Sequence, residues 1–380
     1  MKKYFPLFWV FYLLCAFSAH AGEGRYTIPL TGGGWSLWLD KEASWQNDRL
    51  YLPHEITDLS LLPVNVPTGG WQTLSHNPDA VPVEVPGTVE EYLTVTDNPR
   101  PENFRGVSWW YRKITIPADQ QKKRFIIYFE SVRMRAEVYL DGKLVAYDLI
   151  GETPFHVDIT DEAKPGKEQL LAIRVTNPGG NFHWQDFDIM KWGEYNIPPS
   201  RSFTGIIGRV KLESVNPVFI SDIYMQNTPE LTKVNAILSF TNETSSSVKQ
   251  DVELIVNEKG NPDKVVFRQT LKAISFPAGN HEVTIPVNVP DAKLWDLSTP
   301  ELYTCNVLIK KGKKTLDQDK KDFGFRWFTV DGVGKDAVLR LNGRRIMLRS
   351  AISWGYFPVT GLIATTEMAE KQVRTAKSLA

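Results

Sequence analysis

Cysteine is almost absent from this chain of 380 residues, which contains only Cys15 and Cys305. Cys15 lies in an N-terminal segment that we expect to be removed from the mature protein. A single remaining thiol excludes an internal disulfide, so hydrophobic cores must supply the stability, and a chain of this length has room for more than one. Cys305 lies in the apolar run LYTCNVLI. We interpret it as a buried structural thiol and not as a nucleophile.

The sequence also lacks an excess of charge of either sign, with 44 Lys and Arg against 44 Asp and Glu. Removal of residues 1–21 takes away two lysines and no acidic residue, which leaves 42 against 44 and a net charge of −2. Because nucleic-acid binding depends on a basic face, this balance argues against a nucleic-acid partner. No His, Cys and Asp pattern has the spacing of a zinc site.

No apolar run is long enough to cross a bilayer, which needs about 20 residues. The longest run, from roughly Tyr4 to Phe17, follows Lys2 and Lys3 and precedes Ala19-His20-Ala21. A charged start, a short apolar stretch and an A-x-A site are the parts of a secretory signal peptide. We therefore expect a signal peptide over residues 1–21, export to the periplasm or the extracellular space, and no membrane anchor.

Helical periodicity is nearly absent between residue 22 and about residue 324. Segments such as WWYRKITIP, KRFIIYFES and LLAIRVTNP are short β-rich runs bounded by Gly, Pro, Asn and Asp. Asp141-Gly142 stands between two apolar runs and predicts a two-residue hairpin turn. We expect a mostly β protein with a jelly-roll sandwich over residues 22–216. Strands that recur over residues 217–324 predict a smaller immunoglobulin-like sandwich, which also contains the glycosylation sequon Asn242-Glu243-Thr244.

The pattern changes after Phe325. RWFTVDG and AVLRLNGRRIMLRSAIS predict a hairpin that leads into a buried strand. In TTEMAEKQVRTAKSLA, apolar residues recur at near-helical spacing after a threonine that can serve as the N-cap. Residues 325–380 are therefore expected to form a βα unit.

Residues 181–192, NFHWQDFDIMKW, alternate large aromatic residues with Asp186 and Asp188. The flat face of an indole can stack on a pyranose ring while a carboxylate accepts hydrogen bonds from its hydroxyls. Alternatively, the aromatic side chains close the edge of the sandwich and the carboxylates face water. Two other roles for the aspartates are an acid/base pair about 7 Å apart on one face of a strand and a site for a hard cation.

Several segments, in this order, resemble glycoside hydrolase family 2, which contains β-galactosidases, β-glucuronidases and β-mannosidases. They are GGGWSLWLD with VPVEVPGTV, WWYRKITIP, FESVRMRAEVYLDGKLVAYDLIGETPFHVDIT with LAIRVTNP, TGIIGRVKLES, LWDLSTPELYTCNVLI, and FGFRWFTVDG with LRLNGRRIMLRSA. Each motif alone is weak, but their common order covers almost the whole mature chain.

The resemblance implies a retaining β-glycosidase built on a TIM barrel. In such enzymes two glutamates about 5 Å apart flank the anomeric carbon. A barrel needs about 250 residues, whereas residues 325–380 supply 56. We therefore expect residues 325–380 to be the start of an incomplete barrel, both catalytic glutamates to lie beyond Ala380, and the chain as given to be inactive. The alternative is a non-catalytic carbohydrate-binding protein made of two sandwiches.

The resemblance also suggests which residues contact a carbohydrate. A loop of the first sandwich reaches the barrel mouth at the position of residues 181–192, so Asp186 or Asp188 would contact sugar hydroxyls or an alkali or alkaline-earth cation. No other cofactor is expected. Trp184 and Trp192 would stack on the sugar.

Arg349 ends the presumed first barrel strand, where the family places an arginine near the sugar. Where many members have an N-R-H stretch, this chain has ISWGYFP, so stacking by Trp354 would replace a polar contact. A homo-oligomer is left open.

Overall fold

The computed structural model describes residues 24–44, 59, 64–93, 104, 106–133, 135–148, 153–177, 191–192, 195–196, 204–348, 350 and 366–379. The first half contains β1 (Tyr26–Pro29), β2 (Gly32–Asp40), α1 (Gln72–His76), β3 (Val81–Val85), α2 (Val89–Tyr92), β4 (Gly106–Thr115), β5 (Arg124–Phe129), β6 (Arg135–Leu140), β7 (Lys143–Asp148), β8 (Phe155–Asp158), β9 (Glu168–Asn177), β10 (Lys191–Trp192), β11 (Tyr195–Asn196) and β12 (Val210–Val215). The second half contains β13 (Val218–Asn227), β14 (Lys233–Asn242), β15 (Val248–Glu258), β16 (Asn261–Phe276), β17 (Gly279–Asn288), β18 (Tyr303–Lys311), β19 (Lys314–Phe323), β20 (Phe328–Asp331), β21 (Val338–Leu341), β22 (Arg344–Arg345) and α3 (Thr366–Ser378).

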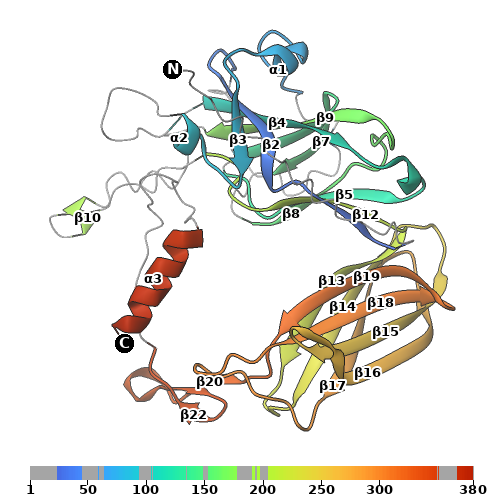
Figure 1. The fold of residues 1–380 in the computed structure, drawn as a ribbon, viewed down its shortest axis with the longest axis vertical. Helices are drawn as coiled ribbons and strands as arrows, with labels where there is room; N and C mark the ends of the chain where they lie inside the picture. The colour runs from blue at the N-terminus through green and yellow to red at the C-terminus, as the bar shows by residue number, and fades with distance from the viewer. Residues whose placement is uncertain are drawn as a thin grey trace, which may run out of the picture.

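The first sandwich pairs a six-stranded sheet, in the order β3-β2-β4-β9-β6-β7, with a four-stranded sheet, in the order β1-β12-β5-β8 (Figure 1). All strand pairs in both sheets are antiparallel. Strands that are neighbours in a sheet are often distant in sequence, because the chain crosses between the two sheets, as it does in jelly-roll sandwiches.

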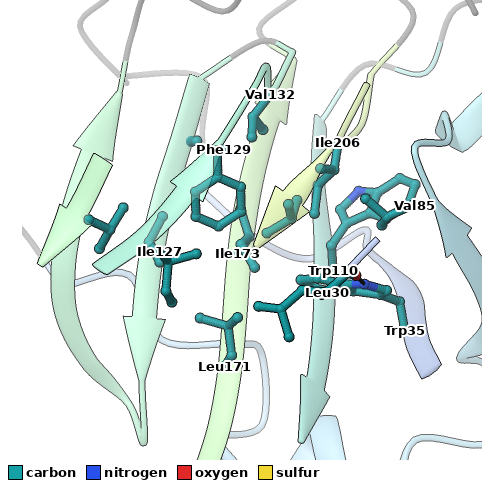
Figure 2. Close-up of a cluster of buried hydrophobic side chains, with 14 of the residues drawn as sticks. Leu30, Trp35, Val85, Trp110, Ile127, Phe129, Val132, Leu171, Ile173 and Ile206 are labelled. Atoms are coloured by element: carbon teal, nitrogen blue, oxygen red, sulfur yellow. Dashed lines mark hydrogen bonds between the residues drawn. The ribbon is translucent and has the colours of Figure 1, made fainter. Parts of the chain in front are cut away.

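The core of this sandwich lies between the two sheets. Figure 2 shows Ile127 and Phe129 of β5 among the same buried side chains as Leu171 and Ile173 of β9, all fully buried. Strand alternation sends Trp110 of β4 into this core. Each such apolar side chain contributes roughly 1.5–3 kcal/mol when it leaves water.

The opposite face of the six-stranded sheet is also covered. Trp109 and Tyr139 on this face are fully buried and pack with Leu74 of α1 and the neighbouring Trp71. The Trp71 ring centroid lies 5.6 Å from that of Trp109 and 5.0 Å from that of Tyr139. The six-stranded sheet is therefore an inner layer, which explains why β4 is apolar at consecutive positions.

The hairpin predicted at Asp141-Gly142 is confirmed between β6 and β7. Both turn residues have positive φ, 48° for Asp141 and 83° for Gly142, as a two-residue hairpin turn of type I′ requires.

The second sandwich has seven strands in two antiparallel sheets, β13-β14-β17 and β16-β15-β18-β19 (Figure 1). A division into three and four strands is that of immunoglobulin-like sandwiches. The mostly β fold with two successive sandwiches is thus confirmed. Cys305 of β18 is fully buried in the second core, and burial raises the pKa of its thiol to about 12. The predicted burial of Cys305 is confirmed, and a thiol with a raised pKa forms little thiolate near neutral pH.

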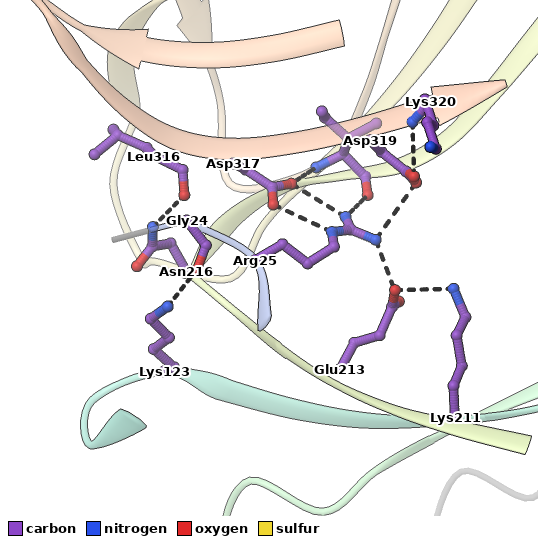
Figure 3. Close-up of polar contacts among 11 residues, drawn as sticks. Gly24, Arg25, Lys123, Lys211, Glu213, Asn216, Leu316, Asp317, Asp319 and Lys320 are labelled. Atoms are coloured by element: carbon purple, nitrogen blue, oxygen red, sulfur yellow. Dashed lines mark hydrogen bonds and ion pairs between the residues drawn. The ribbon is translucent and has the colours of Figure 1, made fainter. Parts of the chain in front are cut away.

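Arg25, just before β1, joins the two sandwiches (Figure 3). Its guanidinium lies 3.1 Å from Asp317 Oδ2 of β19, 3.2 Å from Glu213 Oε2 of β12 and 3.4 Å from Asp319 Oδ2. The Asp317 side chain is completely buried and also accepts a hydrogen bond of 2.7 Å from the backbone N–H of Ile220. Burial raises the pKa of the Asp317 carboxyl, and Arg25 opposes that rise. We refer to this cluster as the Arg25 clasp.

The C-terminal segment agrees with the sequence in one respect and differs in another. The helix predicted after Thr365 is confirmed as α3. The buried strand predicted after the hairpin is wrong for residues 346–348 and 350, which follow β22 and lie in no strand, and the rest of that predicted strand lies outside the described residues. β20, β21 and β22 form a small antiparallel sheet, and Met347 and Leu348 after it are 74% and 60% exposed. An apolar run becomes a buried strand only where another element covers it, and no described element does so here.

Candidate functional site

The predicted sugar-contacting segment leaves the six-stranded sheet at the end of β9. The last residue of β9 is Asn177, and the described chain resumes on the far side at Thr204. The amide Nδ2 of Asn177 donates a hydrogen bond of 2.9 Å to Thr204 Oγ1 and a second to the backbone carbonyl of Phe104. The two ends of residues 178–203 therefore lie side by side, and both are within reach of residue 104.

Glu90 completes this junction. Its carboxylate accepts hydrogen bonds from the backbone N–H groups of Phe104 and Thr204, each at 3.1 Å. Burial raises the pKa of Glu90 to about 7, although both N–H groups and the positive charge of Arg133 oppose the rise. We call Glu90, Phe104, Asn177 and Thr204 the loop base.

Glu90 lies on the short helix α2. The N-terminus of this helix is set by the sequence Thr88-Val-Glu-Glu91. The hydroxyl of Thr88 accepts a hydrogen bond of 3.2 Å from the Glu91 N–H, and the Glu91 carboxylate accepts one from the Thr88 N–H. This reciprocal arrangement is a capping box.

Backbone contacts fix the loop base on its other side. The Val89 N–H donates to the Thr204 carbonyl at 2.7 Å, and Gly205 exchanges hydrogen bonds of 2.7 and 2.8 Å with Arg133. A Cβ atom on Gly205 would lie 2.3 Å from the Gly87 carbonyl oxygen. Only glycine fits between these chain segments, so the return of the chain at residues 204–205 is closely constrained.

Of the six residues predicted to contact sugar, the structure describes Trp192. Trp184, Asp186, Asp188, Arg349 and Trp354 lie outside the described residues. Trp192 belongs to the backbone of β10, which pairs with β11 through Trp192 and Tyr195. The assignments of all six residues stay predictions, as does the cation near Asp186 and Asp188. Within the described part of the chain, no three His, Cys, Asp or Glu side chains are grouped to hold a metal ion.

A buried charge cluster on the outer face of the six-stranded sheet was not anticipated. The Glu137 carboxylate accepts hydrogen bonds from Arg174 at 2.8 Å, from Arg135 at 2.9 Å and from the Tyr139 hydroxyl at 2.7 Å. Both carboxylate oxygens also accept from Asn65 Nδ2. The alternation in RAEVYL places Arg135, Glu137 and Tyr139 on one strand face, which was the signal in the sequence. Because the cluster is buried and its groups pair with one another, it supports the fold.

The sequon at Asn242 is structurally blocked. The Asn242 side chain is 2% exposed, and its Nδ2 donates to the carbonyls of Ser246 and Phe276, both at 2.9 Å. An oligosaccharide could reach this amide only after these contacts break.

None of the helices in the described residues is long and apolar enough to cross a membrane.

Comparisons with known proteins agree with this architecture. Residues 33–197 match the sugar binding domain of glycosyl hydrolases family 2, and residues 218–326 match a second domain of glycosyl hydrolases family 2. A β-glucuronidase of Formosa agariphila is 26% identical over 267 residues, which is 67% of this chain and 26% of that protein. A β-galactosidase of Thermoanaerobacterium thermosulfurigenes is 26% identical over 272 residues, 69% of this chain and 35% of that protein.

Among solved structures, Bacteroides uniformis β-glucuronidase 2, covalently bound to cyclophellitol-6-carboxylate aziridine, superposes with a TM-score of 0.64 at 20% identity. The superposition covers 93% of this chain and 38% of that one. At this identity the likeness shows the fold. The chain spans about a quarter to a third of the length of these two curated relatives. The two family matches together cover well over half of the chain in the expected order, and the chain belongs to glycoside hydrolase family 2.

Proposed function

We propose that this chain is the non-catalytic, N-terminal part of an exported, retaining β-glycosidase, and that its first sandwich helps to hold the sugar. Family membership carries the proposal, since the relatives named above are a β-glucuronidase and a β-galactosidase. The substrate class that follows is a terminal β-linked sugar, with a β-glucuronide or a β-galactoside as the first candidates.

The partners of four buried or partly buried carboxylates support placing the catalytic pair outside the two sandwiches. Retention needs two carboxyl groups about 5 Å apart with room for a sugar between them. Glu137 is surrounded by its own ion pairs, Asp317 is held by Arg25, and Glu90 accepts from two backbone N–H groups. Asp40 accepts from the Thr68 N–H and the Trp109 indole. Each of these carboxylates therefore has a structural role.

Exposed apolar side chains support a catalytic barrel beside the C-terminal segment. Val333 is 88% exposed, Met347 74% and Leu379 83%, and none of the described residues of α3 is buried. Figure 1 shows α3 standing apart from both sandwiches. Large apolar groups gathered on one segment mark a surface that another part of the protein covers. In our proposal the glutamate acting as acid/base and the nucleophilic glutamate belong to that barrel, beyond Ala380.

The sugar contacts remain those predicted from the sequence. Trp184 and Trp192 would stack on the pyranose, Asp186 or Asp188 would accept hydrogen bonds from its hydroxyls, and Arg349 and Trp354 would line the barrel side. The loop base supports the first group, because it fixes both ends of the segment that carries four of these residues.

The test is to isolate the natural polypeptide from its source, measure its intact mass and assay it with 4-nitrophenyl β-D-glucuronide and β-D-galactoside. We expect an N-terminus at Gly22, hydrolysis of at least one of the two substrates, and retention of the anomeric configuration when the first product is followed by NMR. Asp186→Asn and Asp188→Asn should separate the two aspartates, with the larger rise in KM at the one that contacts sugar. Asp263→Asn, at an exposed position of β16, is the matched control.

A polypeptide that ends at Ala380, binds glycans on an array and hydrolyses neither substrate would overturn the proposal in favour of a non-catalytic carbohydrate-binding protein. Hydrolysis with inversion would refute the retaining mechanism alone. An N-terminus at Met1 would refute the signal peptide.

A further inference from the structure

We propose that Glu90 and Asn177 are positioning residues for sugar binding, because they hold together the two ends of the segment that carries the predicted sugar contacts. The inference rests on the proposed function for the identity of the ligand. The loop base itself consists of described residues alone.

Three separate parts of the chain meet at these two side chains. Residue 104 precedes β4, Asn177 ends β9, and Thr204 precedes β12. Glu90 bonds the N–H groups of residues 104 and 204, while Asn177 bonds the carbonyl of residue 104 and the hydroxyl of residue 204. The position of each segment therefore depends on the other two.

Thr204 is fixed by hydrogen bonds at its N–H, its carbonyl and its hydroxyl. Its N–H donates to Glu90, its carbonyl accepts from the Val89 N–H, and its hydroxyl accepts from Asn177. All of these distances lie between 2.7 and 3.1 Å. With Asn177 fixed at the end of a ten-residue strand, both ends of residues 178–203 are fixed in space. A site built on such a segment has less entropy to lose when it orders around a ligand.

The carboxylate of Glu90 is suited to this role because two donors point at it. A leucine of similar size would leave two buried N–H groups without an acceptor, which opens the loop base. A glutamine carries no charge and keeps one acceptor oxygen, while its NH2 group faces the second N–H and cannot accept from it. Glu90→Leu should therefore disrupt sugar binding, and Glu90→Gln, which keeps one of the two hydrogen bonds, should disrupt it less.

The raised pKa of Glu90, about 7, adds a pH signature. The described charge that faces Glu90 from another segment is Arg133, while Glu91 on the same helix turns to the Thr88 N–H. Opening the loop base would return the carboxylate to water, where its pKa is near 4.5. The advantage that protonation gives the closed base is therefore complete below about pH 4.5 and is lost as the pH rises through about 7. Glu90→Gln has no such dependence.

The experiment compares the natural full-length protein with Glu90→Leu, Glu90→Gln and Thr204→Val, and uses Glu84→Leu on the exposed face of β3 as the control. Three quantities are measured: exchange protection of the Phe104 and Thr204 amides, the rate of tryptic cleavage after Lys191 and Arg201, and kcat and KM with the 4-nitrophenyl glycoside that the wild type hydrolyses.

We expect Glu90→Leu to lower amide protection and to raise tryptic cleavage at least tenfold. Its KM should rise at least tenfold, with kcat changed less than threefold. Thr204→Val should change the same quantities in the same direction to a smaller extent. Glu90→Gln should lie between Glu90→Leu and the wild type at pH 6, and its KM should not rise between pH 6 and pH 8 as that of the wild type does. Glu84→Leu should match the wild type.

A loop base that opens in Glu90→Leu while KM stays within twofold of the wild type would overturn the positioning role. Unchanged amide protection in Glu90→Leu would overturn the structural premise. If the wild type hydrolyses neither glycoside, the proposed function fails by itself. A titration with methyl β-D-glucuronide and methyl β-D-galactoside then replaces KM, and equal affinity of the wild type and Glu90→Leu, or binding by neither, counts against the inference.

Discussion

The Arg25 clasp gives the clearest test of what holds the two sandwiches together, through the substitution Arg25→Met. Methionine keeps most of the aliphatic length and removes the charge. The partner left behind is Asp317, whose side chain is completely buried between the sandwiches. Breaking a buried pair by removing one partner costs about 3–5 kcal/mol, because the remaining charge is uncompensated.

The other two ion pairs of Arg25 contribute little to this figure. Asp319 is 38% exposed, so water solvates it once Arg25 is gone. Glu213 keeps its ion pair of 2.8 Å with Lys211. Almost the whole cost therefore belongs to Asp317, and Arg25→Met/Asp317→Asn should recover most of it. The neutral amide still offers an oxygen to the Ile220 N–H and needs no counter-charge.

The assay is urea denaturation of the mature chain at pH 8 and pH 5, followed by tryptophan fluorescence and circular dichroism. In Arg25→Met the pKa of Asp317 in the folded state rises further above its unfolded value. Such a group stabilises the fold below its unfolded pKa and loses that contribution as the pH rises through its folded pKa. The deficit of the variant should therefore be about 3–5 kcal/mol at pH 8 and smaller at pH 5. Arg344→Met, which removes an exposed ion pair with Asp296 at 3.4 Å, is the matched control. A deficit below about 1 kcal/mol at pH 8, or a double variant no more stable than the single one, would refute the reasoning.

Three further predictions concern single groups. Secretion from a glycosylating host should leave Asn242 unmodified, as intact mass would show, and Asn242→Ala should cost about 1–3 kcal/mol in urea because it removes the amide that donates to the buried Phe276 carbonyl. Cys305 should not react with a thiol reagent at pH 8 until urea unfolds the second sandwich; labelling of the folded chain would contradict its burial. Because the pKa of Glu90 is about 7 when folded and near 4.5 when unfolded, this group should make the fold less stable by up to roughly 3 kcal/mol as the pH rises from 5 to 8. Glu90→Gln should remove that slope, and an equal slope in both proteins would assign it to other groups.

Most of the sheet architecture could be predicted because strand alternation and turn residues are local signals. The apolar positions of LLAIRVTNP became β9, and Asp141-Gly142 became the turn between β6 and β7. The buried strand expected near Met347 failed for a related reason. Periodicity shows that a segment is able to be buried, whereas the presence of a covering surface is a property of the rest of the protein.

The long-range polar contacts could not be predicted in the same way. Arg25 reaches a partner 292 residues away, and Glu90 bonds residues 14 and 114 positions further along. Nothing near Arg25 distinguishes it from an exposed arginine, because its partners become neighbours only after both sandwiches have formed. The capping box at Thr88-Glu91 is a local pattern, and although we did not predict a helix there, it marks the helix on which Glu90 lies. It gives no indication of the distant N–H groups that the Glu90 carboxylate binds.

The Arg25 clasp and the loop base rely on the same physical arrangement, an ionisable side chain that is largely withdrawn from water and whose partners come from separate segments. In each case truncating the central residue leaves distant groups unsatisfied, so a single substitution acts on several parts of the chain at once. The two clusters differ in the property of the protein that should change when the central residue is truncated. The clasp connects two sandwiches with large cores of their own, so its loss should weaken their association while both cores stay intact. The loop base borders a segment that carries proposed ligand contacts, so its loss should reduce ligand affinity more than it reduces the stability of the first core.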